Sequence, residues 1–171
     1  MKLCMIGTGY VGLVTGACFA EFGYSVTCID KDDKRLEILK SGKCPFFEPG
    51  MDELLDKHIN KTKLISFKSN IKNNLENSDI IFITVGTPTK RLEEEADLSF
   101  VWQVAEEIAD NIKKYCLVVT KSTVPVGTTR EVKKIISGKV DQKLFDIVSN
   151  PEFLREGSAI DDFIRPDRVV I

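Results

Sequence analysis

The amino-acid sequence predicts an α/β fold of the doubly wound kind, with helices on both faces of a mostly parallel sheet in three α-β-α layers. Short apolar runs rich in valine and isoleucine alternate with longer segments of helical period along the chain. Each run is nearly continuous, as expected for parallel strands that are buried on both faces. Such alternation favours right-handed crossovers within one sheet. The length of 171 residues suits one domain, so residues 1–171 are expected to form a single unit.

The strands and helices follow from these runs in chain order. Strands are predicted at 3–6, 25–29, 64–67, 80–85, 117–120 and 144–149. Helices are predicted near 11–22, 32–40, 51–59, 70–76, 98–113 and 128–137. Within 98–113, apolar residues from Val101 to Ile112 recur at steps of three and four, with acidic residues on the other side. This pattern is typical of an amphipathic helix that lies on a sheet.

Three connecting or terminal segments carry expectations of their own. The segment 42–50 should bend, because Pro45 and Pro49 cannot continue a helix. The charged stretch 90–97 is interpreted as a solvated loop. The apolar residues 169–171 are interpreted as the opening of another strand, which suggests a truncated chain.

Composition excludes several functional classes. The 24 Lys and Arg against 26 Asp and Glu give a net charge of −2, so no basic field would attract nucleic acid or a membrane surface. No apolar run approaches the roughly 18 residues that span a bilayer, and a cytoplasmic protein is expected. The 5 cysteines are odd in number and lack CxxC spacing, which favours reduced core thiols. No metal site is expected, because His58 is the only histidine and is interpreted as a surface residue of a helix.

A glycine motif marks the end of the first predicted strand. Residues 7–12, GTGYVG, fit G-x-G-x-x-G between a strand and a helix. The first glycine permits a tight turn, the second lets the backbone approach a pyrophosphate, and the third lets helix and strand pack closely. The start of the helix then offers free N–H groups and a partial positive charge to the phosphates.

An acidic residue supports the same interpretation. Asp30 ends the second predicted strand, 18 residues beyond Gly12, where a carboxylate can accept hydrogen bonds from a ribose diol. A carboxylate there would repel the 2′-phosphate of NADP, so NAD is expected. Arg35 could partly oppose this repulsion, although a solvated helix residue is the simpler interpretation. Motif, strand, helix and acid together predict a dinucleotide site in a Rossmann fold.

Three later strand ends carry polar residues. The sequences GTPT at 86–89 and KSTVP at 121–125 place hydroxyl groups and prolines at the edge where ligands of open α/β sheets bind. Both are also ordinary turn sequences. The sixth strand is followed by NPEFLREG at 150–157, in which two glutamates stand four residues apart. From spacing alone, this pair is either catalytic or a coincidence of a helix face.

Together, GTGYVGL, VGTPT, KSTVPVGTT and NPEFLREG closely resemble the NAD-binding N-terminal domain of the UDP-glucose/GDP-mannose dehydrogenase family, from residue 1 to residue 171. Within the family, STVPVGT and the closing PDRVVI are more similar to enzymes that oxidise UDP-glucose. The resemblance implies that the C6 alcohol of the sugar nucleotide is oxidised to a carboxylate in two hydride transfers to NAD. The family's nucleophilic cysteine and most of its uridine site belong to a C-terminal half, which these residues do not include.

The resemblance also assigns site residues. It implies that NAD is held by the glycine motif, by the strand-end acid with its neighbour and by later loops, at Gly7, Gly9, Tyr10, Val11, Gly12, Asp30, Arg35, Thr87, Ser122, Thr123 and Glu156. It implies catalytic roles for Thr123, Glu152 and Glu156. In the family, the positions of Thr123 and Glu156 hold a water near the reacting carbon, and that of Glu152 is another active-site carboxylate. It implies sugar-nucleotide contacts at Glu152, Phe153, Leu154, Arg155 and Glu156. In the family's reaction, a thioester formed on the nucleophilic cysteine must be hydrolysed. A carboxylate that acts as a base on a bound water suits this step.

Other functions stay open at this point. A dehydrogenase of GDP-mannose or of another sugar nucleotide shares these motifs. A non-catalytic NAD-binding fragment is the alternative from a different class, and a hydroxy-acid dehydrogenase is disfavoured by NPEFLREG. The resemblance implies a homo-oligomer for the full-length enzyme, and these residues alone are expected not to oxidise UDP-glucose.

Overall fold

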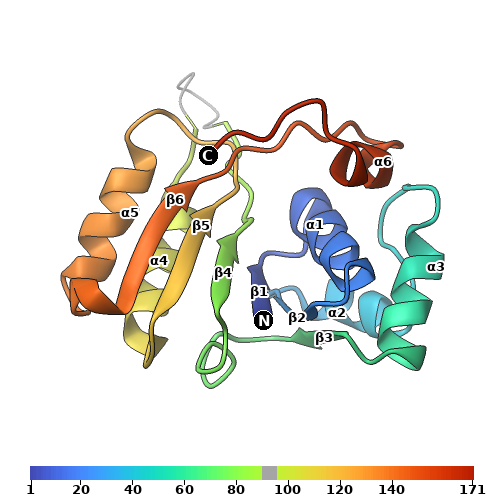
Figure 1. Ribbon diagram of the computed structural model, residues 1–171, viewed down its shortest axis with the longest axis horizontal. Coiled ribbons are helices and arrows are strands. Elements are labelled where there is room, and N and C mark those ends of the chain that lie inside the picture. The colour runs from blue at the N-terminus through green and yellow to red at the C-terminus, as the bar shows by residue number, and fades with distance from the viewer. Residues whose placement is uncertain (90–95) are drawn as a thin grey trace.

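The computed structural model describes residues 1–89 and 96–171. Within these residues, one sheet of six parallel strands has the order β3-β2-β1-β4-β5-β6 (Figure 1). The strands are β1 (Lys2–Ile6), β2 (Ser25–Ile29), β3 (Ile65–Lys68), β4 (Ile80–Ile83), β5 (Cys116–Thr120) and β6 (Phe145–Ser149). The order runs outward in both directions from the β1–β4 pair. This arrangement confirms the doubly wound Rossmann fold and the six predicted strands.

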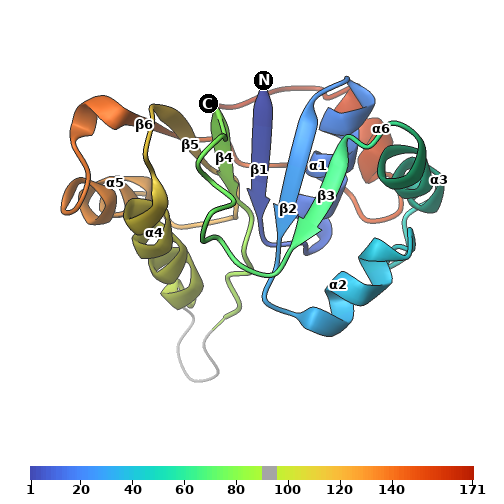
Figure 2. The ribbon, with the colours of Figure 1, turned by 90° about the horizontal axis from the view of Figure 1, so that it is seen from below.

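Helices cover both faces of the sheet (Figures 1 and 2). One apolar core joins the sheet to α1 (Tyr10–Glu21), α2 (Asp33–Lys40), α3 (Met51–Asp56) and α6 (Ala159–Ile164). A second core joins the opposite face to α4 (Ser99–Asn111) and α5 (Thr128–Ser137). The pattern at 98–113 predicted which side chains of α4 face the sheet. These side chains, among them Val101, Val104 and Ile108, are buried. The three-layer prediction is therefore confirmed.

The connection between β3 and β4 contradicts the predicted helix at 70–76. Residues 71–77 form a series of turns, and Asn73 has a left-handed φ of +64°. The side-chain amide of Asn74 donates to the backbone carbonyls of Asn70 (3.0 Å) and Lys72 (3.1 Å). Such local bonds compete with a helical ladder. Ile71 is nevertheless buried, so the apolar spacing was real but the helix was wrong.

The predicted helix at 51–59 is shorter than expected and changes its pitch. It ends as α3 at Asp56 and continues as a π-helical turn, Lys57–Lys61. His58 lies in this turn and is only 2% exposed, so the surface position predicted for it was wrong. Its Nε2 lies 2.8 Å from the Glu21 carboxylate of α1, and its Nδ1 lies 2.9 Å from the Thr62 hydroxyl. The wider turn brings the ring against α1, which a regular helical period could not indicate.

The C-terminal segment holds a helix, α6, that the sequence did not predict, whereas the strand expected at 169–171 is irregular and exposed. The carbonyl of Val170 accepts a hydrogen bond from the side chain of Asn150 (2.8 Å) instead of pairing with a strand. The bend predicted at 42–50 is confirmed as irregular chain. Most of the charged stretch 90–97 lies outside the described residues.

All five cysteines are free thiols, and four of them are buried, which confirms the core assignment. Among residues 1–89 and 96–171, no three or more His, Cys, Asp or Glu side chains are grouped to hold a metal ion. In the same part of the chain, no helix is long and apolar enough to cross a membrane.

Candidate functional site

The glycine motif forms a tight loop between β1 and α1. Gly7 has a φ of +104°, and a Cβ there would lie 2.7 Å from the backbone oxygen of Thr84. A Cβ at Gly12 would lie 2.0 Å from the Gly7 oxygen, which also accepts a hydrogen bond from the Thr84 hydroxyl (2.8 Å). At Gly9 a Cβ would meet nothing within 4 Å. Gly7 and Gly12 therefore permit close packing, whereas Gly9 leaves open space beside the start of α1.

Asp30 directly follows β2 and is held by a dense set of donors. Its Oδ2 accepts hydrogen bonds from the Thr8 backbone N–H (2.8 Å), from the Thr8 hydroxyl (2.6 Å) and from Arg35 (3.2 Å). Its Oδ1 accepts one from the N–H of Asp32 (3.0 Å). Partial burial by itself raises the pKa of the Asp30 carboxyl, but Thr8, Asp32 and the Arg35 charge outweigh it, so this pKa lies below its ordinary value. The carboxylate is charged and fixed in place.

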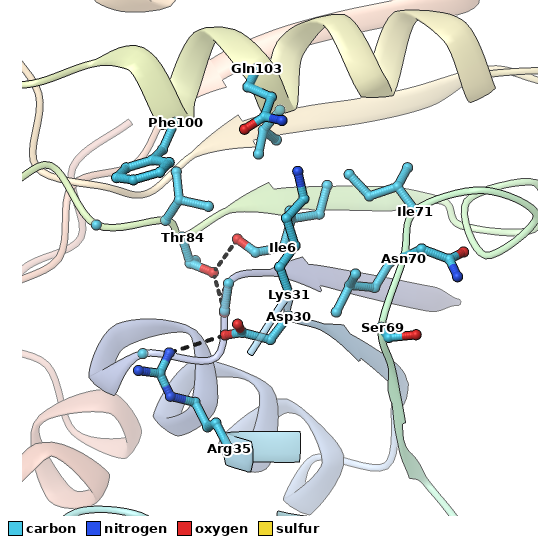
Figure 3. A pocket seen from close by; sticks show the side chains of 16 residues that line it. Ile6, Asp30, Lys31, Arg35, Ser69, Asn70, Ile71, Thr84, Phe100 and Gln103 are labelled. Atoms are coloured by element: carbon cyan, nitrogen blue, oxygen red, sulfur yellow. Dashed lines mark hydrogen bonds and ion pairs between the residues drawn. The ribbon is translucent and has the colours of Figure 1, made fainter. Parts of the chain in front are cut away.

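These groups border one cavity of about 410 Å³, which we term the glycine-loop cleft. Its lining includes Gly7 and Gly9. Asp30 and Arg35 line one side, and Phe100 and Gln103 of α4 line the other (Figure 3). Ile71 from the β3–β4 connection adds an apolar wall. The cleft opens at the carboxyl ends of β1, β2 and β4, next to the point where the strand order reverses. Ligands of open α/β sheets bind at this position.

The loops after β4 and β5 are bonded to each other. The Thr87 hydroxyl donates to the Thr123 carbonyl (2.8 Å). The buried Ser122 hydroxyl donates to the Val85 carbonyl (2.7 Å). The structure therefore brings together the predicted residues Thr87, Ser122 and Thr123, although none of them lines the glycine-loop cleft.

The segment after β6 borders a second cavity of about 600 Å³, here called the strand-end cleft. Its lining includes the predicted residues from Glu152 to Arg155, together with Phe19 of α1 and Phe163 of α6. The Glu152 carboxylate accepts a hydrogen bond from the N–H of Leu154 (2.6 Å).

Of the other predicted residues of this segment, Leu154 is partly buried, whereas Phe153, Arg155 and Glu156 are exposed. Arg155 makes a salt bridge of 2.7 Å with Asp162. The ring of Phe153 lies 5.4 Å from the guanidinium of Arg168. Glu156 is exposed and lies outside the lining of both clefts.

Sequence reasoning missed Lys121, which lines the strand-end cleft. Only 6% of Lys121 is exposed, and its ammonium donates to the Asn150 side chain (3.1 Å). Burial lowers the pKa of this ammonium, and the charge of Glu152 partly opposes the effect. The available signal was a lysine directly after a buried strand.

The three residues of the glycine motif that belong to α1 do not line the glycine-loop cleft. Tyr10, Val11 and Gly12 are not among its lining residues. The Tyr10 hydroxyl is directed toward the buried carboxylate of Glu48 and the N–H of Gly157. Thr8 and Glu48 were also missed, because nothing in their local sequence indicates their partners.

Known proteins resemble the whole chain. A model of the NAD binding domain of the UDP-glucose/GDP-mannose dehydrogenase family matches residues 1–171. The UDP-glucose 6-dehydrogenase of Rhizobium meliloti (strain 1021) is 52% identical over 171 residues, which are 100% of this chain and 39% of the relative. TuaD, the UDP-glucose 6-dehydrogenase of Bacillus subtilis (strain 168), is 46% identical over 99% of this chain and 37% of its own length.

Solved structures give the same comparison. The UDP-glucose dehydrogenase of Pyrobaculum islandicum superposes with a TM-score of 0.92 at 37% identity, over 98% of this chain and 39% of that one. The GDP-mannose dehydrogenase of Pseudomonas aeruginosa, solved as a ternary complex, has a TM-score of 0.93 at 35% identity, over 99% of this chain and 40% of that one. This chain thus spans about two-fifths of the length of these relatives.

Proposed function

The chain belongs to the UDP-glucose/GDP-mannose dehydrogenase family as its NAD-binding domain, and from this membership we propose that it serves the NAD-dependent oxidation of UDP-glucose to UDP-glucuronate. In this proposal, residues 1–171 form the domain that binds NAD and contributes part of the active site. The cysteine nucleophile and most of the uridine site belong to the further length that the relatives have. The full-length enzyme is proposed to be a homo-oligomer.

The glycine-loop cleft fits NAD. The observation that carries this assignment is the fixed Asp30 carboxylate beside the open face of Gly9 in one cavity. A pyrophosphate can approach the backbone at Gly9, where no atom lies within 4 Å of the Cβ position, and can reach the N-terminus of α1. Asp30 would accept hydrogen bonds from the ribose diol and repel a 2′-phosphate, which favours NAD over NADP.

The strand-end cleft fits the sugar nucleotide. When bound, NAD accepts a hydride from the substrate at its nicotinamide ring. We assign to Thr123 and Glu156 the holding of a water near the reacting carbon, and to Glu152 the role of a second active-site carboxylate. Main-chain and side-chain groups from Glu152 to Arg155 would bind the sugar nucleotide, because they line this cavity. The buried Lys121 adds a positive charge near Glu152.

A second candidate substrate is GDP-mannose. The similarity to the Pseudomonas aeruginosa GDP-mannose dehydrogenase, with its TM-score of 0.93, favours it. The two curated relatives cited above are UDP-glucose 6-dehydrogenases at 46–52% identity, so UDP-glucose is the first choice.

Calorimetric titration of the chain with NAD tests the cofactor proposal. We expect saturable binding at one site, which Asp30→Ala weakens by about 1–3 kcal/mol, the usual loss for a hydrogen bond to a charged group. The matched control is Asp33→Ala, because Asp33 is an exposed aspartate in the first turn of α2. Circular dichroism verifies that both variants are folded.

Two results would contradict this assignment. One is the absence of NAD binding by a folded wild-type chain, and the other is an equal, small loss in both variants. The chain alone is further expected to produce no NADH from UDP-glucose, and turnover would show that its residues suffice for catalysis.

A further inference from the structure

Glu48 is a buried carboxylate to which the proposed function assigns no role. It lies in the bend between α2 and α3 and is only 7% exposed. Its Oε2 accepts hydrogen bonds from the Tyr10 hydroxyl and from the N–H of Gly157 (2.9 Å). Its Oε1 accepts a longer one from the N–H of Ile160 (3.3 Å). The carboxylate therefore joins three segments that are far apart in sequence.

The cost of burial makes this arrangement informative. A carboxylate removed from water is destabilising unless it is paired or well hydrogen-bonded. The three donors described here are neutral, and two of them are backbone groups of residues 157 and 160. A neutral side chain of similar size could fill the same space at a lower desolvation cost. The role of a carboxylate at this position therefore lies in the hydrogen bonds by which it holds these segments together.

Those segments are parts of the proposed active site. Tyr10 is the first residue of α1 and directly follows Gly9 of the glycine loop. Gly157 directly follows Glu156, the proposed water-holding carboxylate. The N–H of Gly157 is shared between Glu48 (2.9 Å) and the Tyr10 hydroxyl (2.9 Å), so all three groups meet at one point. The Tyr10 ring also packs on Phe46, two residues before Glu48, with ring centroids 4.8 Å apart.

We propose that Glu48 is a positioning residue that, through Tyr10 and Gly157, fixes the Glu156 backbone relative to the glycine loop. Glu48 lines neither cleft, and its carboxylate oxygens are engaged by the three donors described above, so in this proposal it acts through other residues. The inference rests on the proposed function, because the placement of Glu156 matters only where that carboxylate serves catalysis. A displacement of about 1 Å in such a group can cost roughly 100-fold in rate.

Hydrogen exchange of the 171-residue chain, followed by NMR, tests this role. We expect the Gly157 and Ile160 amides to exchange at least tenfold faster in Glu48→Gln, while amides of β1 and β4 keep their wild-type rates. Tyr10→Phe should accelerate Gly157 by a smaller factor, and it keeps the test valid if Glu48→Gln fails to fold. Glu53→Gln is the matched control, because Glu53 is an exposed glutamate in the first turn of α3.

A second readout separates positioning from simple structural support. Binding of NAD fixes the glycine loop and the start of α1, so it should slow Gly157 exchange severalfold further in the wild type. Glu48→Gln should abolish this effect while its NAD affinity stays within twofold of the wild type.

The proposal is overturned if Gly157 exchange is unchanged in Glu48→Gln, or if β1 and β4 amides accelerate equally. It is also overturned if NAD binds both proteins and protects Gly157 equally in each. A wild-type chain that fails to bind NAD would refute the proposed function instead, and the exchange rates without NAD would still decide the role of Glu48.

Discussion

Two alanine substitutions in the glycine loop should affect different properties, one the stability of the fold and the other the binding of NAD. At Gly12, a Cβ would lie 2.0 Å from the Gly7 oxygen and 2.5 Å from the Thr84 hydroxyl oxygen. At Gly9, a Cβ would meet nothing within 4 Å, and the backbone φ of −67° suits alanine. Gly12→Ala is therefore expected to destabilise the fold, whereas Gly9→Ala should leave the fold intact and obstruct the phosphates.

The cost of Gly12→Ala can be worked from these contacts. The Gly7 oxygen is held by Thr84 and cannot withdraw freely, so the backbone must shift, at about 3 kcal/mol for a severe case of overpacking. Loss of the Thr84 hydrogen bond adds about 1 kcal/mol. Replacing a helical glycine by alanine returns about 1 kcal/mol. The net loss is about 3 kcal/mol, which lowers the melting temperature of a domain of this size by about 6–12 °C.

The expected effect of Gly9→Ala is confined to the ligand. Alanine restricts the unfolded chain, which stabilises by about 0.4–1 kcal/mol, and this gain offsets the lost preference for glycine at the N-cap of α1. Its unfolding free energy should stay within about 0.5 kcal/mol of the wild type. The added methyl group occupies the open space where the pyrophosphate would approach. We expect at least a tenfold loss of NAD affinity, or about 1.4 kcal/mol.

Urea unfolding and NAD calorimetry measure the two quantities. The only tryptophan, Trp102 in α4, supplies the fluorescence signal for unfolding. The reasoning is refuted if both variants lose similar stability, because the 2.0 Å contact at Gly12 would then not govern packing. It is also refuted if Gly9→Ala binds NAD as tightly as the wild type, since the open space at Gly9 would then not be the phosphate site.

Three further predictions concern titration and burial. Burial first, and then the Glu48 carboxylate, raises the pKa of Tyr10 to about 12. Tyrosine NMR should therefore detect a lower Tyr10 pKa in Glu48→Gln, and the fall should be partial because the burial of Tyr10 remains. Replacing the buried His58 by alanine should cost about 2–4 kcal/mol in urea unfolding, through a cavity and lost hydrogen bonds. The matched control is Lys57→Ala, because Lys57 forms an exposed ion pair with Glu21, which is also the partner of His58. This substitution should lower the unfolding free energy by less than about 0.5 kcal/mol. The lowered pKa of Asp30 stabilises the fold above the unfolded-state pKa of about 3.9, and this advantage is lost as pH falls through the lower folded-state value. The stability difference between wild type and Asp30→Asn should therefore shrink below about pH 4, and a constant difference would contradict the shift.

The strands could be predicted because their signal is local. A parallel strand buried on both faces is a continuous apolar run, and all six runs paired as expected. The failures occurred where a local alternative overrode the apolar period. Asn74 bonds to the backbone at 70 and 72 and replaces a helix by turns. The π-helical turn at 57–61 moves His58 inward. The six residues of α6 are too few to establish a helical period.

The candidate site divides in the same way. Gly7, Gly9 and Asp30 could be proposed from the sequence, because a motif and the next strand end place them within one βαβ unit. Glu48 and its partner Gly157 are separated by 109 residues, and no pattern along the chain indicates that they meet. The resemblance to a known family singled out Glu156, but it gave no physical reason for the placement of this residue. The contacts of Glu48 supply a physical candidate for that reason.

The topology explains why such a tether is needed. The glycine-loop cleft is lined in part by α4 (Figure 3), whereas the strand-end cleft is lined in part by α1 and α6. In the ribbon, α4 lies on the opposite face of the sheet from α1 and α6 (Figure 1). In the proposed reaction, NAD and the sugar nucleotide would have to meet between these two clefts. The segment 150–158 carries Glu152 and Glu156 but belongs to no helix or strand, so the sheet alone does not fix it. Anchoring Gly157 to α1 through Glu48 would give this irregular segment the rigidity that catalysis requires.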